Sequence, residues 1–278
     1  MNQYRILIQA PDRSGLVYAA AKIFYENNLN IISNNEFVDN EQNQFFMRTV
    51  VAGDIDAKLL NEKLTAEMPN GTNIIIKLQR KKNIVIMATK EAHVLGDILI
   101  RYLEDQLDAN IVGIISNYNI LRPLCSHFDI PYYHISTDNI SREEHEAKVL
   151  NTLEMFDSID YIVLAKYMRI LSHDFTKRYV NKIINIHHSF LPAFIGANPY
   201  KQAHQRGVKI IGATAHFVNE NLDEGPIIEQ DVIHVDHAYD WQDMQQAGRD
   251  VEKVVLARAL RLALEDRIFV YGNKTVIF

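Results

Sequence analysis

Hydrophobic and polar positions follow two different rhythms along the chain, and the change falls near residue 80. In the first part, four runs suited to β-strands enclose two segments whose apolar residues recur at helical spacing. We therefore expect a compact β-α-β-β-α-β unit over residues 1–80. Its strands are predicted at Tyr4–Ala10, Asn30–Val38, Gln44–Val51 and Thr72–Leu78, and its helices at 16–28 and Ile55–Met68.

From Asn83 onward, short apolar runs alternate with helical patterns, which indicates parallel βαβ units in an open sheet with helices on both faces. Ligands on such sheets bind at the carboxyl ends of the strands. The predicted strands are 83–89, 110–116, 131–135, 161–165, 183–187, 212–218 and 226–235, separated by helices at 93–106, 120–128, 142–156, 173–180 and 199–207. A long helix is predicted at Asp240–Glu265, followed by a terminal hairpin that turns at Gly272–Asn273.

The sequence thus predicts an α/β protein with two domains. A ferredoxin-like βαββαβ domain is expected over residues 1–80, and a Rossmann-like open-sheet domain over residues 83–278. The basic run Arg80, Lys81 and Lys82 marks the boundary, because a charged run between two strands is best placed in solvent.

Composition narrows the classes of function. A hydrophobic fraction of 47% over 278 residues can supply a real core, so disorder is unfavoured. The net charge of −6 argues against a nucleic-acid or anionic-membrane surface. The single cysteine, Cys125, cannot form an internal disulfide, lies in an apolar run and is expected to be buried. The first residues do not resemble a signal peptide, and no apolar run approaches the ~18 residues of a membrane span, so we expect a cytoplasmic protein.

Candidate chemistry gathers between Asn185 and Asp223. Asn185 and His187 are two residues apart in a predicted strand, so their side chains share one face. An amide can hold a carbonyl oxygen, and an imidazole beside it can stabilise an oxyanion or protonate a leaving nitrogen. The loop that follows is broken at Pro192, Gly196 and Pro199, as a binding loop often is.

Asp223, in the loop after the next strand, is the candidate acid that orients water, although Glu220 and Glu224 compete for that role on spacing alone. Alternation along the strand places His188 on the opposite face from His187, where we expect a structural role. His216 is expected to be a hydrogen-bonded core histidine, with a supporting role at the site as the alternative. No metal-binding pattern, GxSxG elbow or GxGxxG loop is present in the sequence.

The first domain resembles an ACT domain, because PDRSGLV at residues 11–17 matches the first strand-to-helix turn of that fold. The resemblance implies an amino-acid effector bound at Asp12, Arg13, Ser14 and Gly15, where free N–H groups at a helix start accept an anion. The alternative is a helix cap on a module that serves dimerisation.

The second domain resembles the folate-dependent formyltransferase fold. Asn185, His187 and Asp223 match its catalytic residues, and LAKYMRILS at 164–172 matches its folate loop. Within that superfamily the whole chain resembles the formyltetrahydrofolate deformylases, as FFMR at 45–48, SNYNILRPL at 116–124, LDEGPIIEQD and the terminal GNKTVIF indicate. The resemblance implies hydrolysis of 10-formyltetrahydrofolate to tetrahydrofolate and formate, which supplies formate for purine biosynthesis and balances the one-carbon folate pools. It implies no cofactor beyond the folate substrate, and a homodimer or homotetramer.

The same resemblance implies where the substrate lies. The pterin is expected against the backbone of Met168, Arg169, Ile170 and Leu171 and of the segment from Val218 through Leu222 to Asp223. Arg169 is a candidate clamp for the glutamate tail, with an ordinary surface arginine as the alternative.

One departure from the related glycinamide ribonucleotide formyltransferases separates hydrolysis from transfer. Those enzymes carry a Gly- and Ser-rich turn for a substrate phosphate, whereas residues 87–97 here read MATKEAHVLGD with the single Gly96. Water is therefore the expected nucleophile. His93 in this segment is expected either to line the cleft opposite His187 or to serve only in the start of a helix, and Val94 stands where the deformylase pattern usually has Cys.

Two rival functions remain open at this point. Formyl transfer to an amine acceptor would use the same fold and would require that acceptor for turnover. A non-catalytic amino-acid or folate sensor would rely on the ACT-like domain and would not need Asn185, His187 and Asp223.

Overall fold

A computed structural model describes residues 2–193 and 199–278 and divides the chain into two compact units. The first unit contains the chain up to Arg80 together with Asp266–Phe269 and Val276–Phe278, and the second contains Lys81–Glu265 and Val270–Thr275. The division therefore differs from a single cut between residues 80 and 83, because seven residues near the C-terminus group with the first unit.

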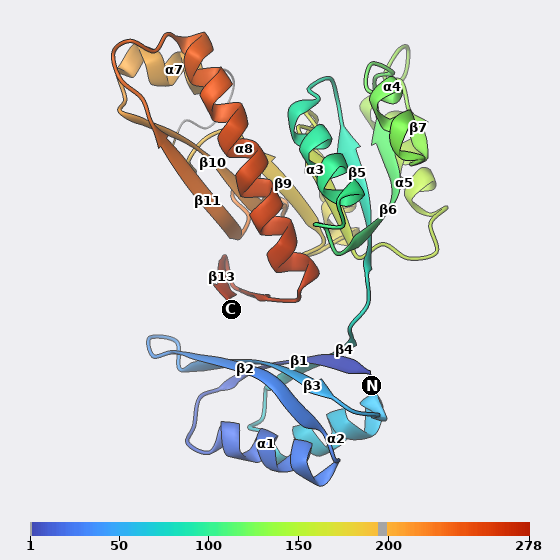
Figure 1. Cartoon of the computed structure of the whole chain (residues 1–278), viewed down its shortest axis with the longest axis vertical. Helices are drawn as coiled ribbons and strands as arrows, with labels where there is room; N and C mark the ends of the chain where they lie inside the picture. The colour runs from blue at the N-terminus through green and yellow to red at the C-terminus, as the bar shows by residue number, and fades with distance from the viewer. Residues whose placement is uncertain (1, 194–198) are drawn as a thin grey trace. The chain divides into compact units, whose positions relative to one another are not determined.

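The first unit is a four-stranded antiparallel sheet in the order β2-β3-β1-β4, with both helices on one face (Figure 1). The elements are β1 (Gln3–Pro11), α1 (Leu16–Glu26), β2 (Asn30–Asp39), β3 (Gln44–Ala52), α2 (Ala57–Glu67) and β4 (Asn73–Leu78). This order confirms the predicted βαββαβ fold. Alternate residues of β1 and β3, such as Ile8 and Met47, pack against Phe24 and Leu64 from the helices.

Local chemistry sets the helix starts in this unit and ties its C-terminal segment down. Gly15 precedes α1 at φ 90°, a left-handed conformation that glycine adopts without a steric penalty. Asp56 caps α2 by accepting hydrogen bonds from two backbone N–H groups. The buried carboxylate of Asp266 pairs with Arg5 at 3.0 Å and with Lys77 at 2.8 Å.

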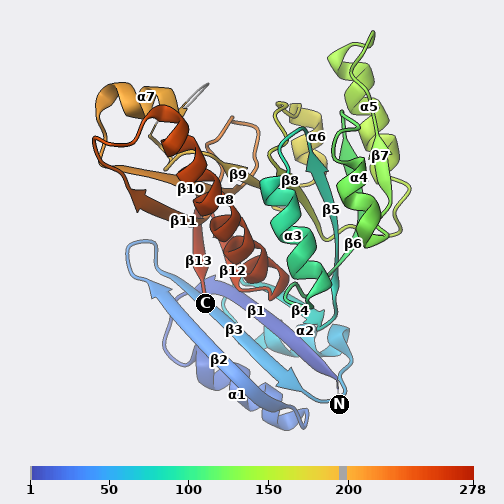
Figure 2. The ribbon, with the colours of Figure 1, turned by 45° about the horizontal axis from the view of Figure 1, so that its top comes forward.

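The second unit is built on a seven-stranded sheet in the order β11-β10-β9-β8-β5-β6-β7. The five strands from β7 to β9 in that order are parallel, and β10 runs antiparallel to both of its neighbours, β9 and β11 (Figure 2). The strands are β5 (Lys82–Ala88), β6 (Ala109–Ser116), β7 (Tyr132–His134), β8 (Tyr161–Ala165), β9 (Ile183–His187), β10 (Ile210–Phe217) and β11 (Ile227–His234). The helices are α3 (His93–Leu103), α4 (Arg122–Cys125), α5 (Arg142–Leu153), α6 (His173–Arg178), α7 (Pro199–Arg206) and α8 (Trp241–Leu264). The C-terminal hairpin, β12 (Ile268–Tyr271) and β13 (Lys274–Ile277), forms as predicted.

This strand order places a crevice at the carboxyl ends of β5 and β8. The chain moves outward from β5 to β6 and β7 and then returns to the other side of β5 as β8, so the loops after β5 and β8 leave in different directions. The Thr89 hydroxyl, just after β5, donates to the backbone oxygen of Lys166, just after β8, at 2.7 Å. The open sheet predicted from the alternating pattern is confirmed, and the functional residues follow the strands at this edge.

One local expectation is confirmed only in part, and another was wrong. The helix predicted over 120–128 is only the four-residue α4 followed by a 3-10 turn at Ser126–Phe128, with a proline in its first turn. Lys82 is buried rather than in solvent, because it begins β5 and its Nζ donates to Ala263 O in the last turn of α8, where a cation is favoured.

The structure also bears on two simpler expectations, which concern Cys125 and membrane spans. Cys125 is buried as predicted, and burial raises the pKa of its thiol to about 11 despite the opposing charge of Arg122. Throughout the described ranges, no helix combines the length and the apolar character needed to cross a membrane.

Candidate active site

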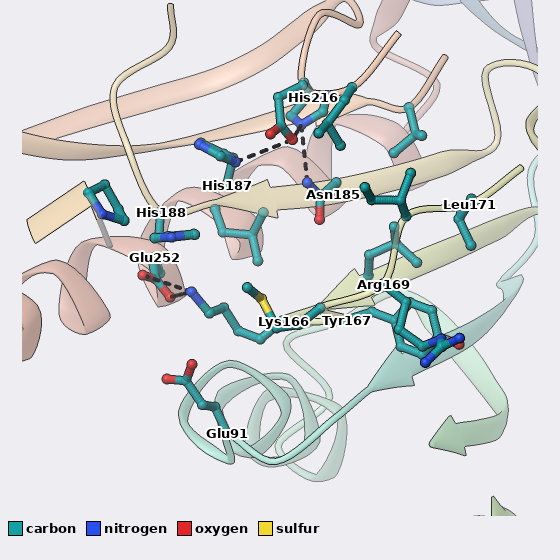
Figure 3. A pocket seen from close by; sticks show the side chains of 18 of the residues that line it. Glu91, Lys166, Tyr167, Arg169, Leu171, Asn185, His187, His188, His216 and Glu252 are labelled. Carbon is teal, nitrogen blue, oxygen red and sulfur yellow. Dashed lines mark hydrogen bonds and ion pairs between the residues drawn. The ribbon is translucent and has the colours of Figure 1, made fainter. Parts of the chain in front are cut away.

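A cavity of about 560 Å³ opens in the second unit, where the carboxyl ends of β8 and β9, the loop after β10, and helices α7 and α8 converge (Figure 3). It collects most of the residues singled out from the sequence, although they are spread over more than fifty positions. The predicted residues that line it are Met168, Arg169, Ile170, Leu171, Asn185, His187, Val218, Leu222 and Asp223.

Asn185 and His187 lie on one face of β9 at the carboxyl end of the strand. Strand β10 pairs with β9 in antiparallel register, which sets His216 opposite Asn185 and Thr214 opposite His187. Cross-strand neighbours are close enough for their side chains to touch. The Asn185 amide nitrogen accordingly lies 3.2 Å from His216 Nε2.

His187 and Asp223 form a buried pair. His187 Nδ1 lies 3.3 Å from Asp223 Oδ1, and the two side chains are only 7% and 12% exposed. The other ring nitrogen, His187 Nε2, is buried and finds no hydrogen-bond partner within the described part of the chain. Such an unpaired buried atom is uncommon and marks a position where a ligand or water is expected to bind.

Asp223 is the acid that the loop turns inward. Its backbone adopts φ 57°, a left-handed conformation that non-glycine residues rarely occupy and that is found more often at functional sites. Burial alone would raise the pKa of its carboxyl, but the hydrogen bond and charge of His187, with smaller contributions from His216 and His188, lower the pKa below its usual range. Glu220 instead pairs with the exposed His173 at 2.9 Å, and Glu224 is exposed.

The tautomer of His216 fixes the orientation of Asn185. Burial lowers the pKa of His216, so the ring is neutral near pH 7. Its Nδ1 lies 2.9 Å from the Phe217 carbonyl, which can only accept, so Nδ1 carries the proton and Nε2 accepts from the Asn185 amide. The second N–H of Asn185 is thereby left for another acceptor. This contact is consistent with the alternative predicted for His216, a supporting role at the site.

The expectation for His188 was wrong. His188 lines the same cavity as His187, and the two ring centroids are 5.0 Å apart. Strand β9 ends at His187, so the alternation of faces that holds within a strand does not extend to the next residue. Burial, followed by the charges of Lys166 and His187, lowers the pKa of His188 to about 4.

A second group of ionisable residues lies at the cavity wall, and of its members only His93 was predicted from the sequence. Glu252 of α8 has no exposed surface, and it accepts from His93 Nε2 at 2.8 Å, from Tyr200 OH at 3.0 Å and from Lys166 Nζ at 3.3 Å. Burial would raise the pKa of Glu252, but the bond from His93 and the charge of Lys166 outweigh it and lower the pKa to about 2. We call Glu252, Lys166, His93 and Tyr200 the Glu252 cluster.

His93 does not line the cavity, contrary to the first of the two expectations for it. Its ring is held by Glu252 and Glu91, behind the residues that face the cavity. The sequence did carry a signal for Glu252: it occupies the stripe of buried positions in α8 that includes Gly248 and Leu256. A glutamate on an otherwise apolar helix face is expected to have a buried partner.

Two parts of the cavity lining differ in character. In one part Met168, Ile170 and Leu222 are 62%, 57% and 55% exposed and offer apolar surface to a flat ring. Arg142 Nη2 donates to Ile170 O at 2.8 Å and holds this loop in place. A different part of the lining contains Lys201 and Trp241, with the Lys201 Nζ 4.5 Å from the centroid of the Trp241 ring.

The remaining predictions fall outside this cavity. The loop break at Gly196 lies outside the described residues. In the first unit, Arg13 Nη2 donates to Glu67 O at 2.7 Å, Asp12 N donates to Asn43 O at 2.9 Å, and no side chain caps α1 after Gly15. No group of three or more His, Cys, Asp or Glu that could hold a metal ion occurs in the residues that the structure describes.

Comparison with known proteins matches each of the two parts of the chain to a family. Residues 82–260 match the family described as formyl transferase, and residues 4–67 match the ACT domain. The fold and the site therefore define a class of proteins in which an ACT domain precedes a formyl transferase domain.

Relatives identify the particular family. The chain is 53% identical to a formyltetrahydrofolate deformylase of Escherichia coli O6:H1, over 96% of this chain and 95% of the relative. It is 53% identical to that of Haemophilus influenzae, over 98% of each chain. A crystal structure of a formyltetrahydrofolate deformylase from Pseudomonas syringae pv. tomato superposes with a TM-score of 0.95 at 42% identity, covering 100% of this chain and 95% of the other. The chain belongs to the formyltetrahydrofolate deformylase family.

Proposed function

We propose that the protein hydrolyses 10-formyltetrahydrofolate to tetrahydrofolate and formate. The observation that carries this proposal is the buried His187–Asp223 pair, whose free Nε2 faces no partner in the described chain, beside an Asn185 amide that has one N–H to spare. The family supports the folate substrate, and a cavity of about 560 Å³ has room for the pterin and the adjoining ring.

The residues that line the cavity indicate how the substrate binds. The pterin lies against the loop of Met168–Leu171 and the segment Val218–Asp223, whose backbone N–H and C=O groups suit its alternating donors and acceptors. The formyl group then reaches the carboxyl end of β9. Asn185 donates its second N–H to the formyl oxygen, because His216 already fixes the other side of that amide.

The reaction joins one water to the formyl carbon and breaks the carbon–nitrogen bond. Asp223, ionised at neutral pH because its pKa is lowered, accepts a hydrogen bond from the water and orients its oxygen toward the formyl carbon. Attack places negative charge on the formyl oxygen, where Asn185 and His187 stabilise it. His187 and Asp223 pass the proton of water to N10 as the bond breaks, so that tetrahydrofolate, formate and one released proton are the products.

Water rather than an amine acceptor is the nucleophile in this proposal. The segment after β5 turns directly into α3 through Lys90, Glu91 and Ala92, and its one nearby glycine, Gly96, lies inside the helix. A cradle of backbone N–H groups for an acceptor phosphate would need a different loop. We propose no cofactor for this reaction, since each proton and charge has a named protein group.

The family also supports proposals for regulation and for the cellular role of the enzyme. An amino acid bound at Asp12–Gly15 would change activity by altering how subunits associate in a homodimer or homotetramer. The enzyme would act in the cytoplasm, where formate released from the folate serves purine biosynthesis and the one-carbon pools stay balanced.

Two variants test the assignment of roles. Asp223→Asn keeps the shape of the side chain and removes its charge, and His187→Ala removes the imidazole. Each is expected to lower kcat by at least about 100-fold, the usual range for acid–base and oxyanion groups, while tetrahydrofolate still binds. Turnover is followed by formate release and binding by fluorescence titration. Wild-type kcat in either variant would remove that residue from the mechanism.

A further inference from the structure

The Glu252 cluster is built to hold a charge inside the protein. Glu252 has no exposed surface, and Lys166 is 5% exposed, with its Nζ 3.3 Å from each carboxylate oxygen. Tyr200 reaches one of those oxygens because its ring packs against Gly248, where an added Cβ would lie 2.1 Å from the hydroxyl. The carboxylate therefore accepts hydrogen bonds from α3, from α7 and from the residue that follows β8.

Burial of an ion pair in this way is not an efficient route to stability. The cost of removing two charges from water often exceeds their mutual attraction, and apolar residues of similar volume frequently stabilise a fold as well. Lys166 and Glu252 also line the cavity, whereas a purely structural pair could lie anywhere in the core. Because they lie in the cavity wall, Lys166 and Glu252 can act on the residues next to them in that wall.

His188 is the residue that connects the Glu252 cluster to the reacting groups. In Figure 3 the His188 ring lies between His187 and the Lys166–Glu252 pair. His188 is partly buried, and it is one of the residues that line the cavity. Lys166, His187, Glu252, Asp223 and Tyr200 are the charged or titratable groups around it.

We propose that Lys166 and Glu252 are positioning residues that hold His188 as a neutral imidazole beside His187, where it serves as the second hydrogen-bond partner of the attacking water. This inference rests on the proposed hydrolysis. Asp223 supplies one hydrogen bond to the water. With that hydrogen bond alone, the water molecule can still rotate about it and its oxygen has no fixed direction. A second contact from His188 fixes the direction of attack.

The charge of His188 matters because of its neighbours. A protonated His188 would be drawn to Asp223 or Glu252 and would compete with water for the catalytic carboxylate. The Lys166 ammonium opposes that protonation, and Glu252 keeps the ammonium in place. Burial acts in the same direction, consistent with a pKa for His188 of about 4.

Opposite changes of charge in the Glu252 cluster provide the test. Lys166→Met leaves the Glu252 carboxylate facing His188 without its cation, so protonation of His188 becomes easier. The acidic limb of the kcat/KM profile is expected to rise by on the order of one pH unit. Glu252→Gln leaves the ammonium alone, so the limb is expected to stay or fall. Lys166→Arg keeps the charge and is expected to restore the wild-type limb.

A matched control is available on the same helix. Lys253 adjoins Glu252 but pairs with Asp250 at 2.8 Å and does not line the cavity, so Lys253→Met is expected to leave the acidic limb unchanged. Both Lys166→Met and Glu252→Gln are expected to lower kcat by roughly 10-fold or more, with less than about a threefold change in KM. Equal shifts of the limb in both variants, or no shift, would overturn the inference and leave a structural pair.

A measurement on the wild-type enzyme tests whether the His188 ring is neutral, and it remains possible if either variant fails to fold. Imidazole NMR of the wild-type protein, with the His188 signal assigned by its loss in His188→Asn, is expected to show a neutral ring down to about pH 5. A ring that titrates between about pH 6 and 7 would contradict the inference. This titration requires no turnover, so it is independent of whether the enzyme proves to be a hydrolase.

Discussion

The glycine two residues after Asp223 gives the sharpest structural prediction. A Cβ placed on Gly225 would lie 1.8 Å from the carbonyl oxygen of Phe217, and an ordinary contact needs 3.4 Å or more. Phe217 N in turn donates to Pro226 O at 2.9 Å, so the chain next to Gly225 is hydrogen-bonded to the end of β10. Gly225→Ala therefore forces a backbone displacement of about 1.5 Å next to the catalytic acid.

That displacement is large compared with the geometry that it disturbs. Asp223 Oδ1 lies 3.3 Å from His187 Nδ1, and a shift of 1 Å or more breaks the pair. Misplacement by about 1 Å can cost about 100-fold in rate, so we expect a kcat at least about 100-fold below wild type. Steady-state formate release measures kcat, and thermal unfolding measures how much stability is lost.

The matched control is Gly96→Ala. Gly96 lies within α3, and an added Cβ meets nothing within 4 Å, so this variant should keep wild-type activity and gain slightly in stability through helix propensity. If Gly225→Ala retained wild-type kcat, the requirement for an accurately placed Asp223 would be refuted.

Three further predictions concern other parts of the second unit. Asn185→Ala should lower kcat by about 100-fold or more with little change in KM. His216→Phe should lower kcat by less, because it removes only the contact that orients the Asn185 amide. Steady-state kinetics measures both, and a larger loss of kcat in His216→Phe would contradict this. The pKa of Glu252 is lowered to about 2, so its contribution to stability is present above its unfolded pKa of 4.5 and is lost as the pH falls toward 2. Urea unfolding of wild type and Glu252→Gln between those pH values should show on the order of 3 kcal/mol of pH-dependent stability that only the wild type has, and parallel curves would contradict it. Cys125, with a pKa of about 11 and no exposure, should react with thiol reagents only after unfolding, and rapid labelling of the native enzyme would be inconsistent with its burial.

The sequence was sufficient wherever the answer depended on local pattern. The alternation of apolar runs predicted both sheets, and the spacing of Asn185 and His187 predicted their shared face on β9. Spacing alone did not separate Asp223 from Glu220, and only the resemblance to a known family favoured Asp223. The structure supplies the physical reason, because the backbone conformation at Asp223 turns its carboxyl toward His187.

Other features depended on contacts between distant elements. Glu252 and Lys166 are 86 positions apart and meet only when α8 packs beside the end of β8. The sequence indicated no separate role for Lys166, which lies in the segment predicted to bind folate. Nothing in the local sequence distinguishes an exposed lysine from a buried one. His188 was misplaced because the strand ends one residue before it, and strand ends are less predictable than strands.

The central claim is that water takes the formyl group, and one measurement tests it most directly. Pure enzyme is given 10-formyltetrahydrofolate in water enriched in oxygen-18, without an amine acceptor, and tetrahydrofolate and formate are quantified together. If water is the nucleophile, equal amounts of the two products are expected, with one oxygen-18 atom in each formate. Release that depends on an added amine, or formate without the label, would contradict it.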